Sequence, residues 1–230
     1  MIQWVKDTIK KFLYKIPSSA ILIFHHISES PKICKSGCLL SFDKFKFIIE
    51  KYNNYGDLIS VVKKPYKRKI AVTFDDALQD VYELAYPYLK KLKIPFTIFV
   101  ITDFIDTEGY ITTEQLKTLA ADPLVTIGSH GASHKVLNQL TPKEQKDEIE
   151  KSKIILEDII KKEIKLFAFS HGAYNKDVLK MLKSYSFGFS TNSRPLNFIT
   201  GLRKKAIPRY NIDSYSYETM KKKLSKIFDN

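Results

Sequence analysis

Three short apolar runs of this chain each end at side chains that could bind a metal ion or transfer a proton. Residues 72–74 lead into Asp75 and Asp76, residues 125–129 lead into His130, and residues 21–24 lead into His25 and His26. In a parallel α/β fold the carboxyl ends of the strands lie on one face, so these groups could converge on a single site. That convergence is the central expectation from the sequence.

A metal site is favoured by the spacing of two histidines. His130 and His134 are four residues apart, which suits two imidazoles on one helical turn that hold one ion. Asp76 would supply an oxygen ligand, and the remaining positions would stay open for water and substrate, as in catalytic metal sites. Adjacent carboxylates on a strand point to opposite sides unless the chain turns, so Asp75 could take a proton. The alternative, in which the acidic pair caps a helix and the histidines are surface residues, explains each element alone but not their combination.

The elements that must position these residues alternate between strands and helices. The strand candidates are short and rich in Ile, Val or Phe; they are residues 20–24, 69–74, 96–101, 124–128, 164–169 and 187–190. Helices are predicted after an N-cap at Ser41, over residues 81–92, and after Thr141, where Pro142 and Glu144 complete a capping box. This alternation favours a parallel sheet, either open or closed into a barrel.

Composition sets limits on the partners. The chain has 230 residues, 44% of them hydrophobic, and a formal net charge of +13, which fits one α/β domain with a substantial core. The basic residues are spread between the apolar positions of the predicted helices, a pattern typical of solvated helix faces. With no zinc-finger, recognition-helix or RNA-binding pattern, we expect no nucleic-acid partner.

The N-terminal segment is predicted to be an amphipathic basic helix. Residues 1–18 form this segment and residues 19–230 the catalytic domain, with the apolar side chains of residues 2–16 on one helical face opposite lysines. Such a helix could associate peripherally with a membrane or pack on the domain, and the sequence leaves both open. Lysines interrupt any signal-peptide core, and no run reaches about 18 apolar residues. A cytoplasmic enzyme, placed at the inner face of the membrane if the helix binds there, is therefore expected.

Cys34 and Cys38 are interpreted as ordinary thiols in a loop.

Two motifs of the chain resemble those of the polysaccharide deacetylases of the NodB-homology type, carbohydrate esterase family 4. The motifs are Thr73-Phe74-Asp75-Asp76 and Ser129-His130-Gly131-Ala132-Ser133-His134, and the similarity runs from about residue 21 to about residue 210. The resemblance implies a single-domain distorted (β/α) barrel and an N-acetylated sugar or glycan as substrate. It also implies that Asp75 is the catalytic base and that Asp76, His130 and His134 bind a divalent metal ion. Zinc is expected, with cobalt or nickel as alternatives.

The chain departs from the usual family pattern at two places. The family's third motif corresponds to residues 167–175, where Ser170 stands in the place of a proline and His171 in the place of a tyrosine. The resemblance implies that the backbone N–H at His171 helps to hold the oxyanion. No histidine follows His171, although the usual order has a catalytic-acid histidine near the C-terminus. A permuted branch carries an aromatic-His motif near the N-terminus instead, which His25 matches as general acid, with His26 as the alternative. Arg209 could replace the motif-three arginine that orients the base.

The implied function is metal-dependent hydrolysis of the N-acetyl group of an amino sugar in a glycan or glycan precursor. Two alternatives remain open at this point. An O-acetyl carbohydrate esterase would use the same residues, and a metal-binding but inactive sugar-binding module would account for the altered third motif. The presence of Asp75 argues against the inactive module. Two adjacent negative charges at Asp75 and Asp76 repel each other, and a protein that only binds sugar has no use for the second carboxylate.

Overall fold

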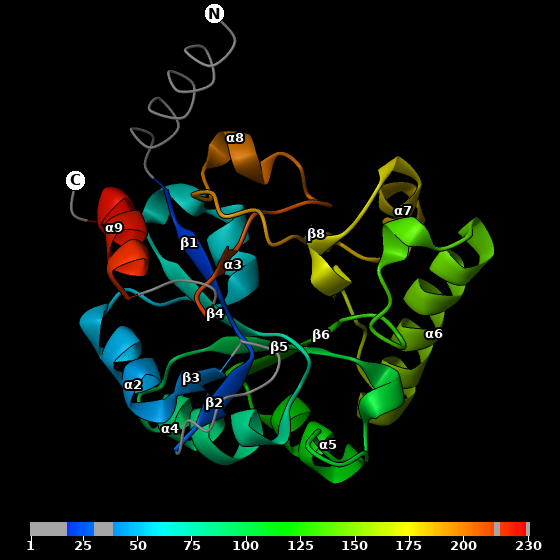
Figure 1. Ribbon diagram of the computed structural model, residues 1–230, viewed down its shortest axis with the longest axis horizontal. Coiled ribbons are helices and arrows are strands. Elements are labelled where there is room, and N and C mark those ends of the chain that lie inside the picture. Colours follow the sequence, from blue (N-terminus) through cyan, green and yellow to red (C-terminus); the bar gives the residue numbers. More distant parts are fainter. Residues whose placement is uncertain (1–17, 30–38, 214–216, 229–230) are drawn as a thin grey trace, which may run out of the picture.

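The computed structural model describes residues 18–29, 39–213 and 217–228, and its centre is a curled sheet of parallel strands (Figure 1). The sheet has seven strands in the order β8-β7-β6-β5-β4-β1-β9. The strands are β1 (Ala20–Phe24), β4 (Ile70–Phe74), β5 (Phe96–Val100), β6 (Val125–Ser129), β7 (Leu166–Ala168), β8 (Phe187–Phe189) and β9 (Tyr210–Asn211). All six predicted strands are present, and β9 is an addition. Because every ladder is parallel, the carboxyl ends of the strands lie on one face.

The two edges of the sheet are brought together by residues 207–211. Ile207 forms a parallel bridge with Phe189 at the end of β8, and Tyr210 pairs with Leu22 in β1. The chain therefore curls into the distorted barrel that the resemblance implied. This segment also carries Arg209, which is thereby held between the two edges of the sheet.

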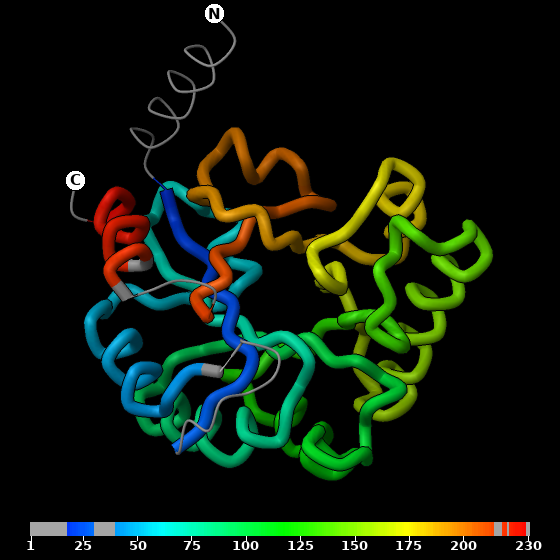
Figure 2. Tube along the Cα trace, in the orientation of Figure 1, coloured from blue at the N-terminus to red at the C-terminus, as the bar shows by residue number. Residues whose placement is uncertain are grey.

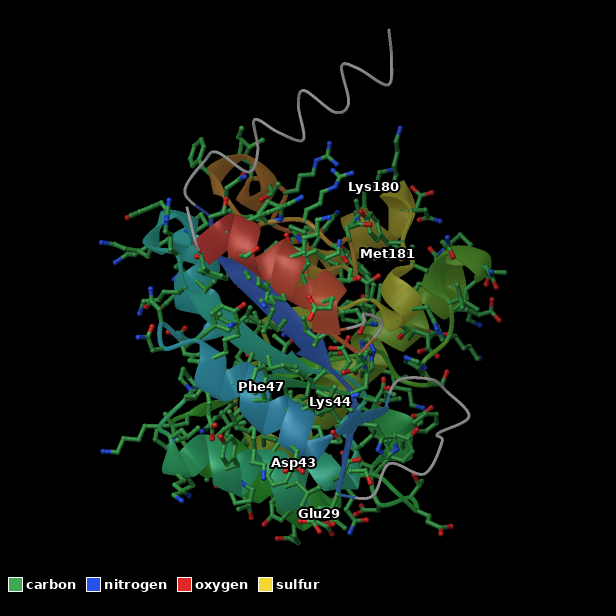
Figure 3. The ribbon with its side chains drawn as sticks, turned by 60° about the vertical axis from the view of Figure 1, so that its left-hand side comes forward. Glu29, Asp43, Lys44, Phe47, Lys180 and Met181 are labelled. Atoms are coloured by element: carbon green, nitrogen blue, oxygen red, sulfur yellow. The ribbon has the colours of Figure 1, made fainter. Side chains whose placement is uncertain are left out.

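Helices surround the sheet, as the continuous tube in Figure 2 shows. The α-helices are α2 (Phe42–Lys51), α3 (Leu58–Lys63), α4 (Tyr86–Lys91), α5 (Thr113–Ala121), α6 (Pro142–Ile160), α7 (Lys176–Met181), α8 (Phe198–Gly201) and α9 (Tyr217–Phe228). A side view shows α9 lying along β1 (Figure 3), where it buries Leu224 and Ile227 in the core. Two predicted helix starts are confirmed: the Ser41 side chain accepts from the N–H of Lys44, and Thr141 forms a capping box with Glu144.

A second, small sheet was not predicted. Its two strands, β2 (His26–Ser28) and β3 (Leu39–Ser41), pair in parallel beyond the end of β1. The predicted N-terminal helix and the two cysteines fall in residues 1–17 and 30–38, outside the described residues. No helix in the described part of the chain is both long enough and apolar enough to span a membrane.

Candidate active site

Three side chains from the carboxyl ends of β4 and β6 form a compact group of metal-ligating atoms. The Nε2 atoms of His130 and His134 each lie 3.4 Å from Oδ1 of Asp76, and the three ligand atoms lie within 4.8 Å of one another. Oδ1 of Asp76 is buried and has no hydrogen-bond partner. An unpaired buried carboxylate oxygen is costly unless a cation satisfies it. One carboxylate with two imidazoles also matches the donor set of catalytic zinc sites, so these residues fit a divalent ion.

The backbone turns sharply at the metal-ligating residues. At Asp76 the chain leaves β4 with φ of 70°, and at His134 φ is 62°. These left-handed conformations are unfavourable for residues with a side chain and are typical of functional sites. The turn at Asp76 lets its carboxylate and that of Asp75 face different partners. The expectation that His130 and His134 share a helical turn is wrong: residues 130–134 form a loop, in which Gly131 has φ of 85°.

The ring of His130 is oriented by a backbone carbonyl. Its Nδ1 lies 2.9 Å from the carbonyl oxygen of Ala168 in β7. A carbonyl can only accept, so Nδ1 carries a proton, and Nε2 is the nitrogen that lies toward Asp76 and is available to bind a metal ion. Metal-ligating histidines are commonly fixed in this way. His130 is only 2% exposed, which holds the ring in one orientation.

The second histidine of the group is kept neutral by its surroundings. Burial, reinforced by the nearby His130, lowers the pKa of His134 to about 4. A neutral imidazole is the form that binds metal. On its other side, the ring of His171 lies with its centroid 4.5 Å from that of His134. His171 is exposed and has φ of 56°, so the structure brings this residue to the edge of the metal-ligating group.

Asp75 pairs with Arg209 and lies next to this group, with its Oδ2 3.9 Å from Nε2 of His130. The guanidinium donates from Nη1 to Oδ1 at 2.7 Å and from Nη2 to Oδ2 at 2.8 Å. Both side chains are almost completely buried, and Arg209 also donates to Oγ1 of Thr73 and to the carbonyl of Ser190. Burial alone would raise the pKa of Asp75, but the charge of Arg209 and its hydrogen bonds to the carboxylate outweigh burial and lower the pKa to about 2. Asp75 is therefore ionised at neutral pH.

His25, at the end of β1, pairs with Asp213. Oδ2 of Asp213 accepts from the backbone N–H of His25 at 2.8 Å and from its Nδ1 at 2.9 Å. Burial lowers the pKa of His25. The hydrogen bond to Asp213 and the charges of Asp75 and Asp76 raise the pKa by more than burial lowers it, so the net shift is upward. The imidazole is therefore held by one nitrogen, with a raised affinity for a proton on the other.

The neighbouring histidine is engaged elsewhere. Nδ1 of His26 forms a short contact with Oδ2 of Asp80, which also accepts from the N–H of Ile27. The two adjacent histidines thus have different carboxylate partners, Asp213 and Asp80. This favours His25 over His26 as the residue that faces Asp75 and Asp76.

A buried glutamate holds the loop between the two metal-ligating histidines. The carboxylate of Glu148, on α6, accepts from the N–H of Ala132 at 3.0 Å and from that of Ser133 at 2.9 Å. It also accepts from the Ser133 hydroxyl. At Gly131, an added Cβ would lie 3.3 Å from Oε2 of Glu148. Glu148 therefore fixes the path of the chain from His130 to His134 without belonging to the metal-ligating group.

Sequence reasoning missed Asp213, Glu148 and Asp80. The sequence pattern could have indicated two of them, Asp213 and Glu148. Asp213 is the first acidic residue after a stretch from 178 to 212 that has none. Glu148 lies one position before Ile149 and four before Ser152, on the buried face of α6, where an unpaired carboxylate would be unfavourable. Asp80 had no comparable signal, because it resembles any polar residue at the start of a helix.

Comparison with known proteins gives the same assignment as the motifs. A model of the family described as polysaccharide deacetylase matches residues 62–189. YxkH of Bacillus subtilis strain 168 is 33% identical over 133 residues, which cover 58% of this chain and 47% of YxkH. The chain therefore spans about half the length of that relative. The poly-beta-1,6-N-acetyl-D-glucosamine N-deacetylase of Staphylococcus aureus strain MSSA476 is 26% identical over 232 residues, 94% of this chain and 77% of the enzyme.

Solved structures support the fold. A polysaccharide deacetylase from Bacillus cereus superposes with a TM-score of 0.77 at 22% identity, over 90% of this chain and 69% of that one. IcaB from Ammonifex degensii gives 0.74 at 19% identity, over 92% and 97%. The family match covers more than half of the chain, and the matched residues include Asp76, His130 and His134. This chain belongs to the polysaccharide deacetylase family.

Proposed function

We propose that this protein removes N-acetyl groups from amino sugars in a glycan, with Asp75 as base and His25 as acid. The observation that carries the proposal is the arrangement around Asp76. A metal-ligating group, a carboxylate ionised by Arg209 and a histidine with a raised pKa meet at the carboxyl ends of β1, β4 and β6. Hydrolysis of an amide needs a polarised carbonyl, a base for the attacking water and an acid for the leaving amine.

Asp76, His130 and His134 would hold the divalent ion. When bound, such an ion polarises the acetyl carbonyl and makes water more acidic. Two imidazoles and a carboxylate favour zinc, with cobalt or nickel as alternatives. The Ala168 carbonyl and Glu148 keep the ligands in place from behind. This supports a site whose geometry is formed before the ion arrives.

The chain's own residues would carry the proton transfers. Asp75, fixed by two hydrogen bonds from Arg209, removes a proton from the attacking water. The amine leaves poorly unless it is protonated, so the imidazolium of His25 donates a proton to the nitrogen. Asp213 keeps this ring oriented and charged. The backbone N–H of His171, beside His134, would donate to the oxyanion. The products are acetate and a free amino sugar.

The relatives guide the choice of substrate. The Staphylococcus aureus enzyme, similar over 94% of this chain, acts on poly-beta-1,6-N-acetyl-D-glucosamine. We therefore propose a β-1,6-linked N-acetylglucosamine glycan as the first substrate to test. A panel of N-acetylated and O-acetylated oligosaccharides, incubated with zinc, cobalt or nickel and assayed for acetate, tests the proposal. Release from the O-acetylated members alone would assign the protein as an esterase instead. A location at the cytoplasmic face of the membrane, through residues 2–16, stays a prediction that cell fractionation would test.

A further inference from the structure

A separate pocket lies between the segment that follows β8 and helix α8. Its volume is about 180 Å³, and its walls include Arg194 and Arg203 together with Asn192 and Tyr174. None of its described lining residues is acidic. Neither arginine has an ion-pair partner within residues 18–29, 39–213 and 217–228. The pocket therefore offers two guanidinium groups and polar side chains, and no carboxylate of the described residues pairs with either guanidinium.

The choice of arginine at this place is unusual for this chain. Only four of its 38 basic residues are arginines, and one of the four is Arg209 at the active site. Both basic side chains that line the pocket are nevertheless arginines. A solvated basic surface would be built from lysine, as elsewhere in the chain. The planar guanidinium instead matches the geometry of phosphate, to which it can donate two parallel hydrogen bonds.

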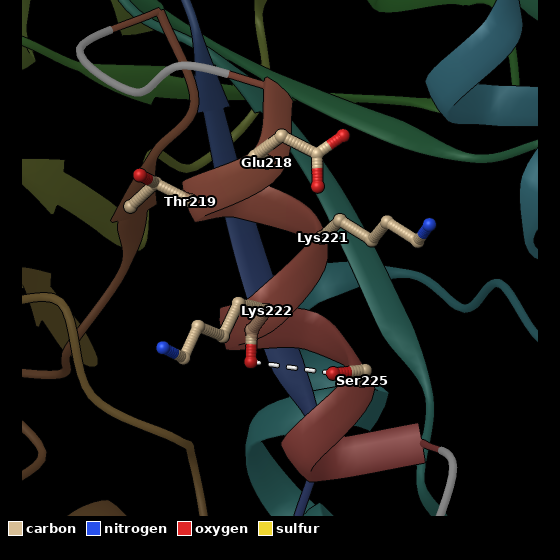
Figure 4. A pocket seen from close by; sticks show the side chains of 5 residues that line it. All are labelled: Glu218, Thr219, Lys221, Lys222 and Ser225. Atoms are coloured by element: carbon tan, nitrogen blue, oxygen red, sulfur yellow. Dashed lines mark hydrogen bonds between the residues drawn. The ribbon is translucent and has the colours of Figure 1, made fainter.

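Two other hollows of the described surface lack this character. The described lining residues of the hollow along α9 all belong to that helix, and Lys221 and Lys222 point in different directions (Figure 4). The groove between α6 and α7, near Lys180 and Met181 in Figure 3, contains lysines together with Glu150 and Asp177. In that groove Lys180 is already paired with Asp177. A net excess of unpaired positive charge in a concave site is therefore found at the arginine pocket.

The arginine pocket is connected to the residues around the active site. Nδ2 of Asn192 lies 3.4 Å from the hydroxyl of Tyr174, which it can reach as a donor. Pro208, another lining residue, directly precedes Arg209. The carbonyl of Ser190, two residues before Asn192, accepts from Nε of Arg209. A ligand held in the pocket would thus rest against the same two segments that hold Arg209 beside Asp75.

Apolar side chains are exposed next to the pocket. Phe198 in α8 and Leu202 just after it are 69% and 63% exposed, and Ile199, which lines the pocket, is 45% exposed. Bulky apolar groups around an anion site are a feature of surfaces that meet lipid headgroups. These exposed side chains favour a phosphate of a lipid headgroup at a bilayer surface over a phosphate in solution. The arginines would recognise both by the same hydrogen bonds.

We propose that the pocket between Arg194 and Arg203 binds a phosphate group, either of a lipid headgroup or of a soluble phosphate ester. This goes beyond the proposed deacetylation, because the pocket shares no residue with the metal-ligating group or with the proposed acid and base. The pocket would hold the protein, or a phosphate-bearing ligand, in a fixed position relative to the active site.

The test begins with titration of the full chain with glycerol 3-phosphate, followed by nuclear magnetic resonance. Arg194→Gln and Arg203→Gln should each weaken binding by about tenfold or more, as expected for loss of a charge-assisted pair. The double variant Arg194→Lys/Arg203→Lys keeps the charge and should still bind more weakly, because the bidentate geometry is lost. Lys91→Gln/Lys143→Gln, which removes two exposed charges from α4 and α6, is the matched control and should bind as the wild type does. Thermal melts of each variant confirm folding.

Sedimentation with vesicles identifies the source of the phosphate. If the ligand is a lipid headgroup, the protein binds phosphatidylglycerol vesicles but not phosphatidylcholine vesicles. The double variants Arg194→Gln/Arg203→Gln and Phe198→Ser/Leu202→Ser should each reduce this binding. For a soluble ester, glycerol 3-phosphate binds and the vesicles do not. The proposal is overturned if the double variant Arg194→Gln/Arg203→Gln binds glycerol 3-phosphate and the phosphatidylglycerol vesicles as the wild type does. It is also overturned if glucuronate, a carboxylate probe, binds as tightly as the phosphate. Acetate release from a glycan tests the deacetylase separately.

Discussion

Arg209 and Asp75 are 134 positions apart in the chain and meet through two parallel hydrogen bonds of 2.7 and 2.8 Å in the interior. The contact exists because residues 207–211 join the two edges of the sheet, which places Arg209 beside the end of β4. The guanidinium of Arg209 also lies over the rings of Phe99 and Phe189, with its carbon 5.0 and 5.9 Å from the two ring centroids. Closure of the barrel and ionisation of the proposed base therefore depend on the same segment.

Arg209→Met should destabilise the protein by about 3–5 kcal/mol, because it leaves the Asp75 carboxylate buried without its partner. The double variant Asp75→Asn/Arg209→Met removes both charges and should recover part of that loss. Urea unfolding at neutral pH measures both, with the exposed Lys91→Met as control. An Arg209→Met protein that unfolds at the wild-type urea concentration would contradict the energetic role of the pair.

The same pair predicts a pH dependence of stability. The folded pKa of Asp75 is lowered to about 2, whereas an unfolded aspartate titrates near about 3.9. The stabilisation is therefore present above about pH 4 and is lost as the pH falls toward 2. Urea midpoints measured from pH 6 to pH 2.5 should fall less steeply for Asp75→Asn/Arg209→Met than for the wild type. Parallel curves would show that other carboxylates control acid unfolding.

His130→Ala and His134→Ala should each lose the divalent ion while the fold remains. Each variant removes one of three protein ligands from an open site, which should weaken binding by orders of magnitude. The core is apolar and independent of these side chains. Elemental analysis of the purified variants measures the ion, with His26→Ala as the control. Full occupancy in both variants would rule out the assigned ligands.

Glu148→Gln should weaken metal binding by about 10–100-fold, the range seen when groups behind the ligands are changed. The neutral amide oxygen of glutamine accepts the N–H groups of Ala132 and Ser133 more weakly than the carboxylate oxygen does, and the amide nitrogen cannot accept from the Ser133 hydroxyl, so the loop should loosen. Competition with a chromogenic chelator measures the dissociation constant. Glu150→Gln, exposed on the same helix, is the control. An equal change in both variants would assign the effect to surface charge.

His25→Ala should lower kcat on an N-acetylated sugar by about 10²–10⁴-fold, as expected for a lost general acid. On an activated ester, whose leaving group needs no proton, the loss should be much smaller. Equal losses on the two substrates would remove His25 from the acid role, and a catalytic null at His26→Ala would transfer that role to His26.

Asp213→Asn tests the partner of that acid. His25 must be protonated to donate, and Asp213 contributes to its raised pKa. Without Asp213 the pKa falls, so the decline of kcat on the alkaline side should begin at lower pH. Asp80→Asn, which alters the partner of His26 instead, should leave the alkaline limb in place. A shift of the limb by Asp80→Asn alone would reverse the two assignments.

The sequence predicted the strands and the residues at their ends because both depend on local pattern. Runs such as residues 20–24 are apolar and bounded by polar residues, and the parallel arrangement then places Asp76, His130 and His134 at one edge. The conformation of residues 130–134 could not be predicted from spacing. A four-residue interval fits a helical turn, but Gly131 and the hydrogen bonds to Glu148 select a loop.

The contacts of Arg209 and Asp213 were harder to predict, because they depend on how the barrel closes. The strand β9 has two residues, too few for a recognisable alternation of apolar side chains. An arginine after Pro208 looks like a surface residue until the segment is seen between β8 and β1. The family resemblance pointed to Arg209, whereas nothing in the resemblance pointed to Asp213.

The proposed role of Asp75 is that of a base beside an ion held by Asp76. It is tested most directly by acetate release from a β-1,6-linked N-acetylglucosamine oligosaccharide, measured with metal content for Asp75→Asn and Asp76→Asn. We expect that the wild type releases acetate only when metal is supplied, that Asp75→Asn keeps the ion but loses turnover, and that Asp76→Asn loses both. An Asp75→Asn protein that binds the ion and releases acetate at a near-normal rate would contradict it.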